Sequence, residues 1–194
     1  MIIRKLFKFE GAHIVRDCSS RRCKLSVHGH SYQVEVFFTA DKLDNGGMIV
    51  DFGLLKGTIK DFVDSFDHCY AMWTKEKQDF KDFIINHSER WVEMPVTPSA
   101  EMLSLMFFYV INEITLNTDF TNGEGDVKLH SVRVHETDTG WAESFASDMK
   151  FFKYGLSDII ISDAIKDEWK DPLMWEKLIM RTRFINPIVE LKYQ

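Results

Sequence analysis

Apolar and polar residues alternate along two segments near the N-terminus, and apolar residues recur at helical spacing along two later segments. The alternating segments, residues 2–9 and 31–39, are rich in β-branched and aromatic residues and therefore predict strands. Apolar residues three and four positions apart predict one helix over residues 52–66 and a second that starts after Ser99. Asp51 and Ser99 are placed as N-caps, because their short polar side chains can accept hydrogen bonds from free backbone N–H groups.

Two further strands complete the predicted sheet. They cover residues 127–137 and 141–152 and pair across the turn at 138–140. Over residues 1–152 the order is two strands, two helices and two strands, which predicts an α+β fold with helices laid on an antiparallel sheet. Shorter elements are predicted at residues 48–50 (strand), 76–90 (helix) and 91–96 (extended).

The C-terminal part of the chain has a different character. We divide the chain into a domain of residues 1–152 and a helical C-terminal extension of residues 153–194. Asp171 followed by Pro172 favours a helix start, because proline already has the backbone angle of the first helical position. No chemistry is assigned to this extension.

Composition narrows the class of protein. The chain has 194 residues, of which 45% are hydrophobic and 13% aromatic, which is typical of a globular protein. Its net charge of −6 argues against nucleic-acid binding, and no apolar run is long enough to span a membrane. Three cysteines are too few for a disulfide framework. Residues 1–9 do not resemble a signal peptide, because charged residues interrupt their apolar positions. We therefore expect a reduced, cytoplasmic protein.

His28 and His30 are the first candidates for chemistry. Residues two apart on a strand project from the same face, so both imidazoles point in one direction, and Gly29 between them leaves room for a close approach. With His13, fifteen positions before His28, they can hold a catalytic zinc ion that keeps one coordination position open. The alternative is that they are ordinary surface or core histidines.

A polar, basic loop lies between these histidines. It contains two thiols, of which Cys23 is placed nearer to the histidine pair than Cys18. On an acidic protein its basic residues stand out, and they indicate either a seat for an anionic substrate or a solvated loop. These residues are Arg16, Arg21, Arg22 and Lys24.

Asp67 and His68 directly follow the first predicted helix. An adjacent carboxylate can hold an imidazole in one tautomer and raise its basicity for proton transfer, although this dipeptide is common in proteins. Asp51 is interpreted as a helix cap and not as a catalytic group.

Six short motifs occur in a fixed order along residues 1–150. They are Gly11-Ala12-His13, Cys23 with His28-Gly29-His30, Met48-Ile49-Val50-Asp51-Phe52, Asp67-His68, Pro98-Ser99-Ala100-Glu101 and Glu136-Thr137. In this order they resemble the 6-pyruvoyl-tetrahydropterin synthase family, which includes the 6-carboxy-tetrahydropterin synthases of the queuosine pathway. Ser99 stands where threonine is usual in the family, and Met102 where asparagine is usual.

The resemblance implies a fold, an assembly and a set of site residues. The fold is the tunnelling fold, a four-stranded antiparallel sheet with two helices on one face, and the assembly is a homohexamer, a dimer of trimers with active sites between subunits. The implied zinc ligands are His13, His28 and His30. The implied catalytic residues are Cys23, Asp67 and His68, and the implied substrate-binding residues are Glu136, which anchors the pterin ring, and Thr137.

The resemblance also implies a reaction. The expected activity is that of a zinc-dependent lyase that converts 7,8-dihydroneopterin triphosphate to 6-carboxy-5,6,7,8-tetrahydropterin with loss of triphosphate and acetaldehyde. The alternative is 6-pyruvoyl-tetrahydropterin synthase, which eliminates triphosphate without cleaving a carbon–carbon bond. Asp51 favours the first branch, because the second tends to carry asparagine at that position. A zinc hydrolase and a non-enzymatic zinc- or pterin-binding module remain further alternatives.

Overall fold

The computed structural model describes residues 1–186 of the chain. Its strands are β1 (Ile2–His13), β2 (His28–Thr39), β3 (Cys69–Trp73), β4 (Trp91–Met94), β5 (Thr118–Phe120), β6 (Lys128–Thr137), β7 (Gly140–Ser144), β8 (Ile160–Ile161) and β9 (Phe184–Asn186). Its helices are α1 (Arg21–Leu25), α2 (Phe52–Lys56), α3 (Thr58–Asp64), α4 (Gln78–His87), α5 (Ala100–Leu116), α6 (Asp163–Asp167) and α7 (Met174–Ile179), with short 3₁₀ helices at Ala146–Phe151 and Leu156–Asp158.

The main sheet is larger than predicted. Seven strands follow one another in the order β7-β6-β2-β1-β3-β4-β8, and β5 pairs with β9 in a second sheet. The four strands expected from the sequence are the adjacent antiparallel strands β7, β6, β2 and β1. The prediction of a four-stranded, wholly antiparallel sheet is wrong, because β3 and β4 continue the sheet in parallel and β8 is added at the edge.

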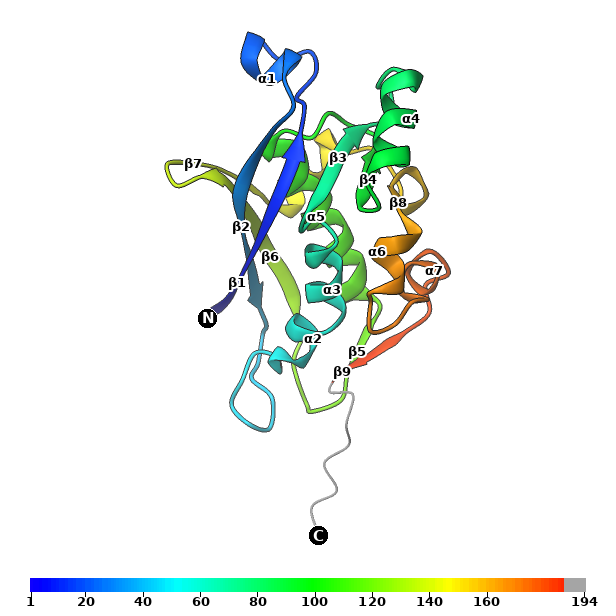
Figure 1. The fold of residues 1–194 in the computed structure, drawn as a ribbon. Coiled ribbons are helices and arrows are strands. Elements are labelled where there is room, and N and C mark those ends of the chain that lie inside the picture. Colours follow the sequence, from blue (N-terminus) through cyan, green and yellow to red (C-terminus); the bar gives the residue numbers. More distant parts are fainter. Residues whose placement is uncertain (187–194) are drawn as a thin grey trace.

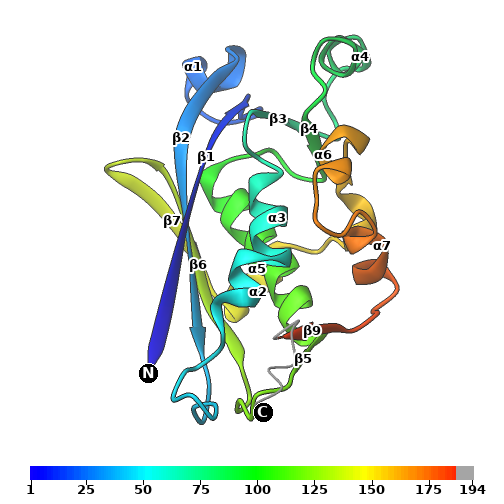
Figure 2. The same ribbon diagram turned by 60° about the horizontal axis from the view of Figure 1, so that its bottom comes forward.

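The α+β class is confirmed. Helices α3 and α5 cover one face of the sheet, as Figure 2 shows from below. Phe9 of β1 and Val34 of β2 pack with Phe62 of α3 and Phe107 of α5 in a continuous hydrophobic core. Because side chains alternate along a strand, the neighbours of these residues point to the opposite face of the sheet. That opposite face is called the outer face below.

Several local predictions are confirmed and others are wrong. Asp51 caps α2, and Ser99 caps α5 by accepting a hydrogen bond from the backbone N–H of Met102 at 3.3 Å. The helix predicted over residues 52–66 is interrupted at Gly57, where the backbone leaves the helical region, and forms α2 and α3. The strand predicted at 48–50 is absent, and the strand predicted over 141–152 ends at Ser144 and gives way to a 3₁₀ helix.

In the described part of the C-terminal extension, residues 153–186, β8 joins the edge of the main sheet, whereas α6 and α7 pack on the side of α3 away from β1 and β2 (Figures 1 and 2). It contains two short α-helices, a 3₁₀ helix and two short strands, so its helical character is only partial. Trp169 and Trp175 are buried in the same hydrophobic core as the sheet, and Trp175 stacks on Phe62 with ring centroids 6.0 Å apart. In residues 1–186, none of the helices has both the length and the apolar character needed to cross a membrane.

Candidate metal and substrate site

Three histidines converge where β1 ends and β2 begins. The antiparallel register places His13 opposite His28, and His30 follows two positions later on β2. One ligand atom from each ring lies within 4.8 Å of the others. The centroid of the His13 ring lies 4.5 Å from that of His28 and 5.3 Å from that of His30. This spacing suits three ligands around one ion.

Backbone carbonyl groups set the tautomers of two of these rings. Nδ1 of His13 donates to the carbonyl of Pro98 at 2.6 Å, and Nδ1 of His28 donates to the carbonyl of Ser26 at 3.0 Å. A carbonyl only accepts, so both rings carry their proton on Nδ1 and keep the Nε2 lone pair for a ligand bond. Nε2 of His30 is buried and has no hydrogen-bond partner within residues 1–186. A buried polar atom without a partner is costly, and a bound metal ion would satisfy it.

The surroundings of His13 and His30 favour the neutral, metal-binding form of each ring. Burial and the neighbouring imidazoles lower the pKa of His13 to about 4, although the Pro98 carbonyl opposes this change. Burial also lowers the pKa of His30, against the opposing charge of Glu136. Neutral imidazole nitrogens are typical zinc ligands, and three of them leave one position for a water molecule or a substrate. The donor set therefore fits zinc.

Glu136 and Tyr32 border the histidine cluster. One carboxylate oxygen of Glu136 lies 3.5 Å from Nε2 of His13 and 3.6 Å from Nε2 of His30. The Tyr32 hydroxyl lies 3.2 Å from Nδ1 of His13, and burial raises the pKa of Tyr32, so the hydroxyl stays protonated. Tyr32 was not predicted, although its position two residues after His30 placed it on the same strand face. Thr137, the last residue of β6, is exposed.

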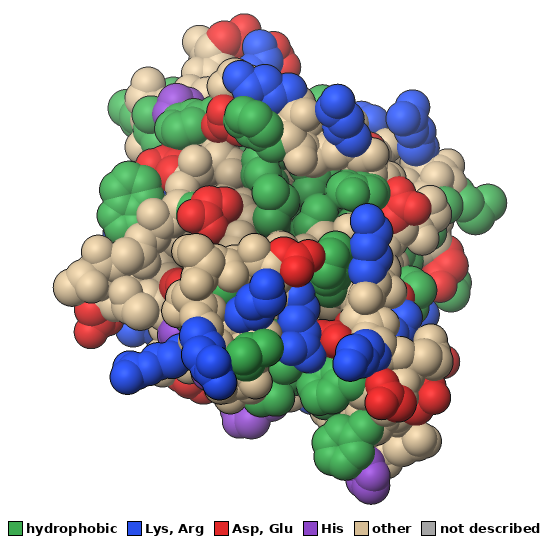
Figure 3. Space-filling view, turned by 90° about the horizontal axis from the view of Figure 1, so that it is seen from above, with side chains coloured by type: hydrophobic (Ala, Val, Ile, Leu, Met, Phe, Trp, Pro, Cys, Tyr) green, Lys and Arg blue, Asp and Glu red, His purple; other side chains and the backbone are tan. Residues whose placement is uncertain are grey.

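The basic loop forms α1 above the end of β1 and β2 (Figure 1). Cys23 is half-buried on α1, and its carbonyl accepts a hydrogen bond from the N–H of Val15, two residues beyond His13. Arg16 is engaged elsewhere, because its Nε donates to Glu76 at 2.6 Å. The remaining basic residues of the loop, Arg21, Arg22 and Lys24, lie on α1. Figure 3 looks onto this end of the molecule, where lysine and arginine side chains gather among hydrophobic and acidic ones.

Asp67 and His68 form a hydrogen-bonded pair at the start of β3. Oδ2 of Asp67 lies 3.0 Å from Nδ1 of His68, and Oδ1 of Asp67 accepts from the backbone N–H of Glu10 at 2.8 Å. Burial raises the pKa of Asp67, but these hydrogen bonds and the charge of Arg90 outweigh it and hold the pKa below its usual value. The His68 side chain is exposed, and its backbone has a positive φ of 52°.

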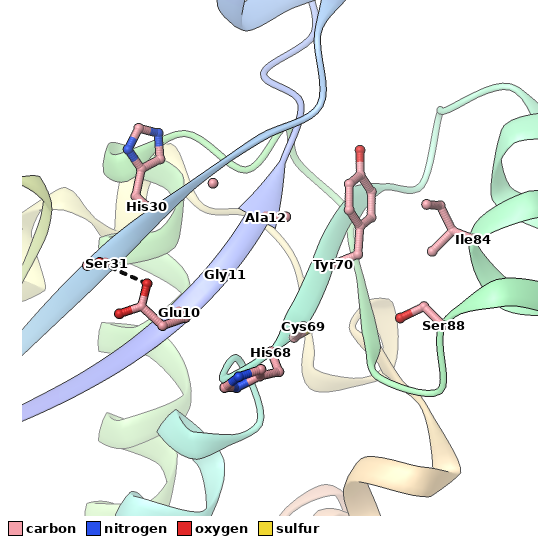
Figure 4. A pocket seen from close by; sticks show the side chains of 11 residues that line it. Glu10, Gly11, Ala12, His30, Ser31, His68, Cys69, Tyr70, Ile84 and Ser88 are labelled. Atoms are coloured by element: carbon pink, nitrogen blue, oxygen red, sulfur yellow. Dashed lines mark hydrogen bonds between the residues drawn. The ribbon is translucent and has the colours of Figure 1, made fainter.

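The Asp67–His68 pair lies on the outer face of the sheet. His30 and Cys69 both pair with Gly11 of β1, so these residues are two strand spacings apart, about 10 Å. His68 lines a depression of about 570 Å³ together with His30 and the outer-face residues Glu10 and Ser31. Figure 4 shows His30 on β2 and His68 at the start of β3, on either side of β1. His13 and His28 do not line this depression, so the histidine cluster and the Asp67–His68 pair share it only through His30.

Comparison with known proteins places the chain in a family. Residues 2–146 match the family model described as 6-pyruvoyl tetrahydropterin synthase. The chain belongs to the 6-pyruvoyl tetrahydropterin synthase family. A family relative from Helicobacter pylori, named 6-carboxy-5,6,7,8-tetrahydropterin synthase, is 44% identical over 183 residues, which cover 92% of each chain.

Two solved structures have the same fold as this member of the 6-pyruvoyl tetrahydropterin synthase family. An uncharacterized protein of Wolinella succinogenes has a TM-score of 0.61 at 20% identity and covers 75% of this chain and 98% of its own. The 6-pyruvoyl tetrahydropterin synthase of Caenorhabditis elegans has a TM-score of 0.52 at 18% identity and covers 75% of this chain and 95% of its own. The Helicobacter match covers so much of the chain that it includes most of residues 153–194, whereas these two structures match only about three-quarters of the chain.

Proposed function

We propose that this protein is a zinc-dependent lyase that converts 7,8-dihydroneopterin triphosphate to 6-carboxy-5,6,7,8-tetrahydropterin with loss of triphosphate and acetaldehyde, a reaction of queuosine biosynthesis. The observation that carries the proposal is the convergence of His13, His28 and His30, with Glu136 at their border, in a chain 44% identical to a relative named for this product. Asp51, which caps α2, supports the 6-carboxy branch.

His13, His28 and His30 would hold the zinc ion through their Nε2 atoms, since two of the three Nδ1 atoms already donate to carbonyl groups. Bound zinc would supply a Lewis acid that eases loss of a carbon-bound proton next to a coordinated hydroxyl group. Tyr32, protonated and packed against His13, helps to hold that ring in place.

The other groups have roles in proton transfer and binding. Cys23 would accept a proton as a thiolate, and His68, oriented by Asp67, would move a second proton. Glu136 would accept two parallel hydrogen bonds from a ring N–H and the exocyclic amine of the pterin, which fixes a flat ring. Thr137 is placed beside it. Basic residues of α1 would face the triphosphate.

We propose a homohexamer, a dimer of trimers, with active sites between subunits. Supporting this, His13 and His30 lie on the strand face of the core residues Phe9 and Tyr32, whereas His68 is exposed beside Glu10 and Ser31 of the opposite face, in a depression that only His30 of the cluster also lines. A substrate at the histidines would then meet the Asp67–His68 pair of the partner subunit. Mixing inactive Cys23→Ala and His68→Ala subunits should restore about a quarter of the wild-type rate if the two residues belong to different chains at each site. Failure to restore activity in verified mixed oligomers would contradict this arrangement.

We further propose that residues 1–152 form the catalytic domain and that residues 153–194 are a C-terminal extension to it. All three cysteines, Cys18, Cys23 and Cys69, are free, which supports a reduced cytoplasmic setting for the reactive thiol.

The test is to incubate purified, zinc-loaded protein with 7,8-dihydroneopterin triphosphate and to identify the products by mass spectrometry. The proposal predicts 6-carboxy-tetrahydropterin together with acetaldehyde and triphosphate. A product that keeps the three-carbon side chain would instead assign the 6-pyruvoyl reaction. Turnover that survives Cys23→Ala but not His28→Ala would favour a zinc hydrolase, and zinc binding without turnover would favour a structural or binding module.

A further inference from the structure

The extension reaches the turn that carries Asp67 and His68. Arg90 lies beneath this turn, with its Nε donating to the carbonyl of Asp67 at 2.8 Å and its Nη2 donating to the carbonyl of Asp64 at 2.9 Å. The third contact of the guanidinium group, through Nη1, is with the carboxylate of Glu168 in the extension. Arg90 and Glu168 also line a polar depression of about 360 Å³ that borders His68.

A second contact from the extension holds the same turn. The indole N–H of Trp169 donates to the hydroxyl of Ser65 at 2.9 Å, and both side chains are buried. The backbone N–H of Lys170 donates to the carboxylate of Asp61, one turn earlier on α3, at 3.0 Å. Residues 168–170 are therefore attached to the end of α3 and to the turn that follows it.

The geometry of this turn depends on the contacts around it. His68 has a left-handed backbone conformation, which is unfavourable for a residue with a side chain, and such residues persist where their surroundings determine them. The guanidinium group of Arg90 is planar, so two carbonyl contacts and one carboxylate contact together fix its orientation. Glu168 is largely exposed, so its ion pair adds little stability in itself, and its effect is to orient Arg90.

We propose that Glu168 and Trp169 of the extension are positioning residues, which act through Arg90 and Ser65 to hold the Asp67–His68 pair in place for proton transfer. This inference rests on the proposed function for the role of His68, but the contacts themselves can be tested without substrate. It gives residues 153–186 a task at the active site, although none of them lies in the histidine cluster.

The chain provides matched controls for both contacts. Arg183 donates to the backbone carbonyls of Leu116 and Thr118 and to the carboxylate of Asp119, the same set of contacts that Arg90 makes, but at the β5–β9 pair. Trp175 is a second buried tryptophan of the extension that stacks on Phe62. Arg90→Lys is compared with Arg183→Lys, and Trp169→Phe with Trp175→Phe, each as the full-length protein.

The first measurement is made without substrate. In ¹⁵N-labelled protein, the Nδ1 resonance of His68 reports its hydrogen bond to Asp67, and exchange of the His68 backbone amide reports its bond to the Glu10 carbonyl, 2.7 Å in length. Arg90→Lys and Trp169→Phe should shift the Nδ1 resonance and speed amide exchange at least about tenfold, whereas Arg183→Lys and Trp175→Phe should change neither. Equal effects of the two members of a pair would overturn the inference.

The second measurement is steady-state kinetics. Displacement of the His68 ring should lower kcat by about ten- to a hundredfold with KM changed less than about threefold, and Glu168→Gln should give a smaller loss of the same kind. The control variants should stay within about twofold of wild type in kcat. Altered His68 resonances without any loss of kcat would remove the role in catalysis, and an inactive wild-type protein would refute the proposed function but leave the structural part of the inference standing.

Discussion

His28→Ala is the perturbation that isolates the proposed metal site. His28 is half-buried at the first position of β2, so removal of its ring leaves the core intact. His13, by contrast, is 1% exposed and bonded to Pro98, so its replacement would also weaken the fold. Loss of zinc affinity in His28→Ala can therefore be attributed to the missing nitrogen.

The expected size of the effect follows from general zinc energetics. Four-ligand structural sites bind zinc with about 10–16 kcal/mol, or about 3 kcal/mol for each ligand, which corresponds to about a hundredfold in affinity. At a free zinc concentration about a thousand times the wild-type Kd, zinc should stabilise the wild type by about 4 kcal/mol, but His28→Ala by only about 1.4 kcal/mol. For a chain of this size the zinc-induced rise in Tm should fall from about 8–16 °C to about 3–6 °C.

The assay combines chelator competition, which gives the zinc Kd, with thermal unfolding in the presence and absence of zinc. His68→Ala is the control, because His68 lies outside the histidine cluster and its removal should leave zinc affinity unchanged. A zinc Kd for His28→Ala within about threefold of wild type would refute the three-histidine site.

Three further outcomes are expected from other parts of the chain. Glu136→Gln should retain zinc but raise KM for the pterin substrate at least about tenfold, since one charged hydrogen-bond acceptor is lost; an unchanged KM in steady-state kinetics would contradict that role. A hydrogen bond from the backbone N–H of Met48, with another from the Asn122 side chain, holds the pKa of Asp44 below its usual range despite burial. Asp44 therefore contributes its full stability above the pKa that it has in the unfolded state, and this contribution is lost as pH falls through its pKa in the folded state. Asp44→Asn should therefore lower the free energy of unfolding by about 1–2 kcal/mol at pH 7, and urea titrations should show this difference shrinking below about pH 4. Ser99→Ala should cost about 1 kcal/mol in the same urea assay through loss of the α5 cap, and no change would contradict the Ser99–Met102 contact.

Residues whose placement follows from the periodicity of one strand or helix could be predicted from the sequence. The i, i+2 spacing of His28 and His30 placed both rings on one strand face, and the structure has them there. The caps at Asp51 and Ser99 follow from side-chain chemistry within one turn of helix. His13 was added to this pair as a third imidazole of suitable chemistry, but its convergence on the pair depends on the register of β1 against β2, which spacing along the chain does not give.

Features set by tertiary contacts could not be predicted. β3 is buried along nearly its whole length, so Cys69–Trp73 lacks the alternation that marks a strand with one exposed face. β8 has two residues and β9 three, too few for any pattern, and both exist because a partner strand is present. The backbone breaks at Gly57 although the apolar residues keep their helical spacing on both sides of it, so the spacing alone did not reveal the break. The contact of Glu168 with Arg90 joins residues 78 positions apart, which periodicity cannot reveal.

The decisive experiment is to strip the protein of metal, restore it with zinc, and measure how much acetaldehyde is released for each triphosphate when each form is given 7,8-dihydroneopterin triphosphate. With zinc we expect about one acetaldehyde for each triphosphate, and from the metal-free protein neither product. Triphosphate release without acetaldehyde, or full turnover by the metal-free protein, would contradict the proposed function.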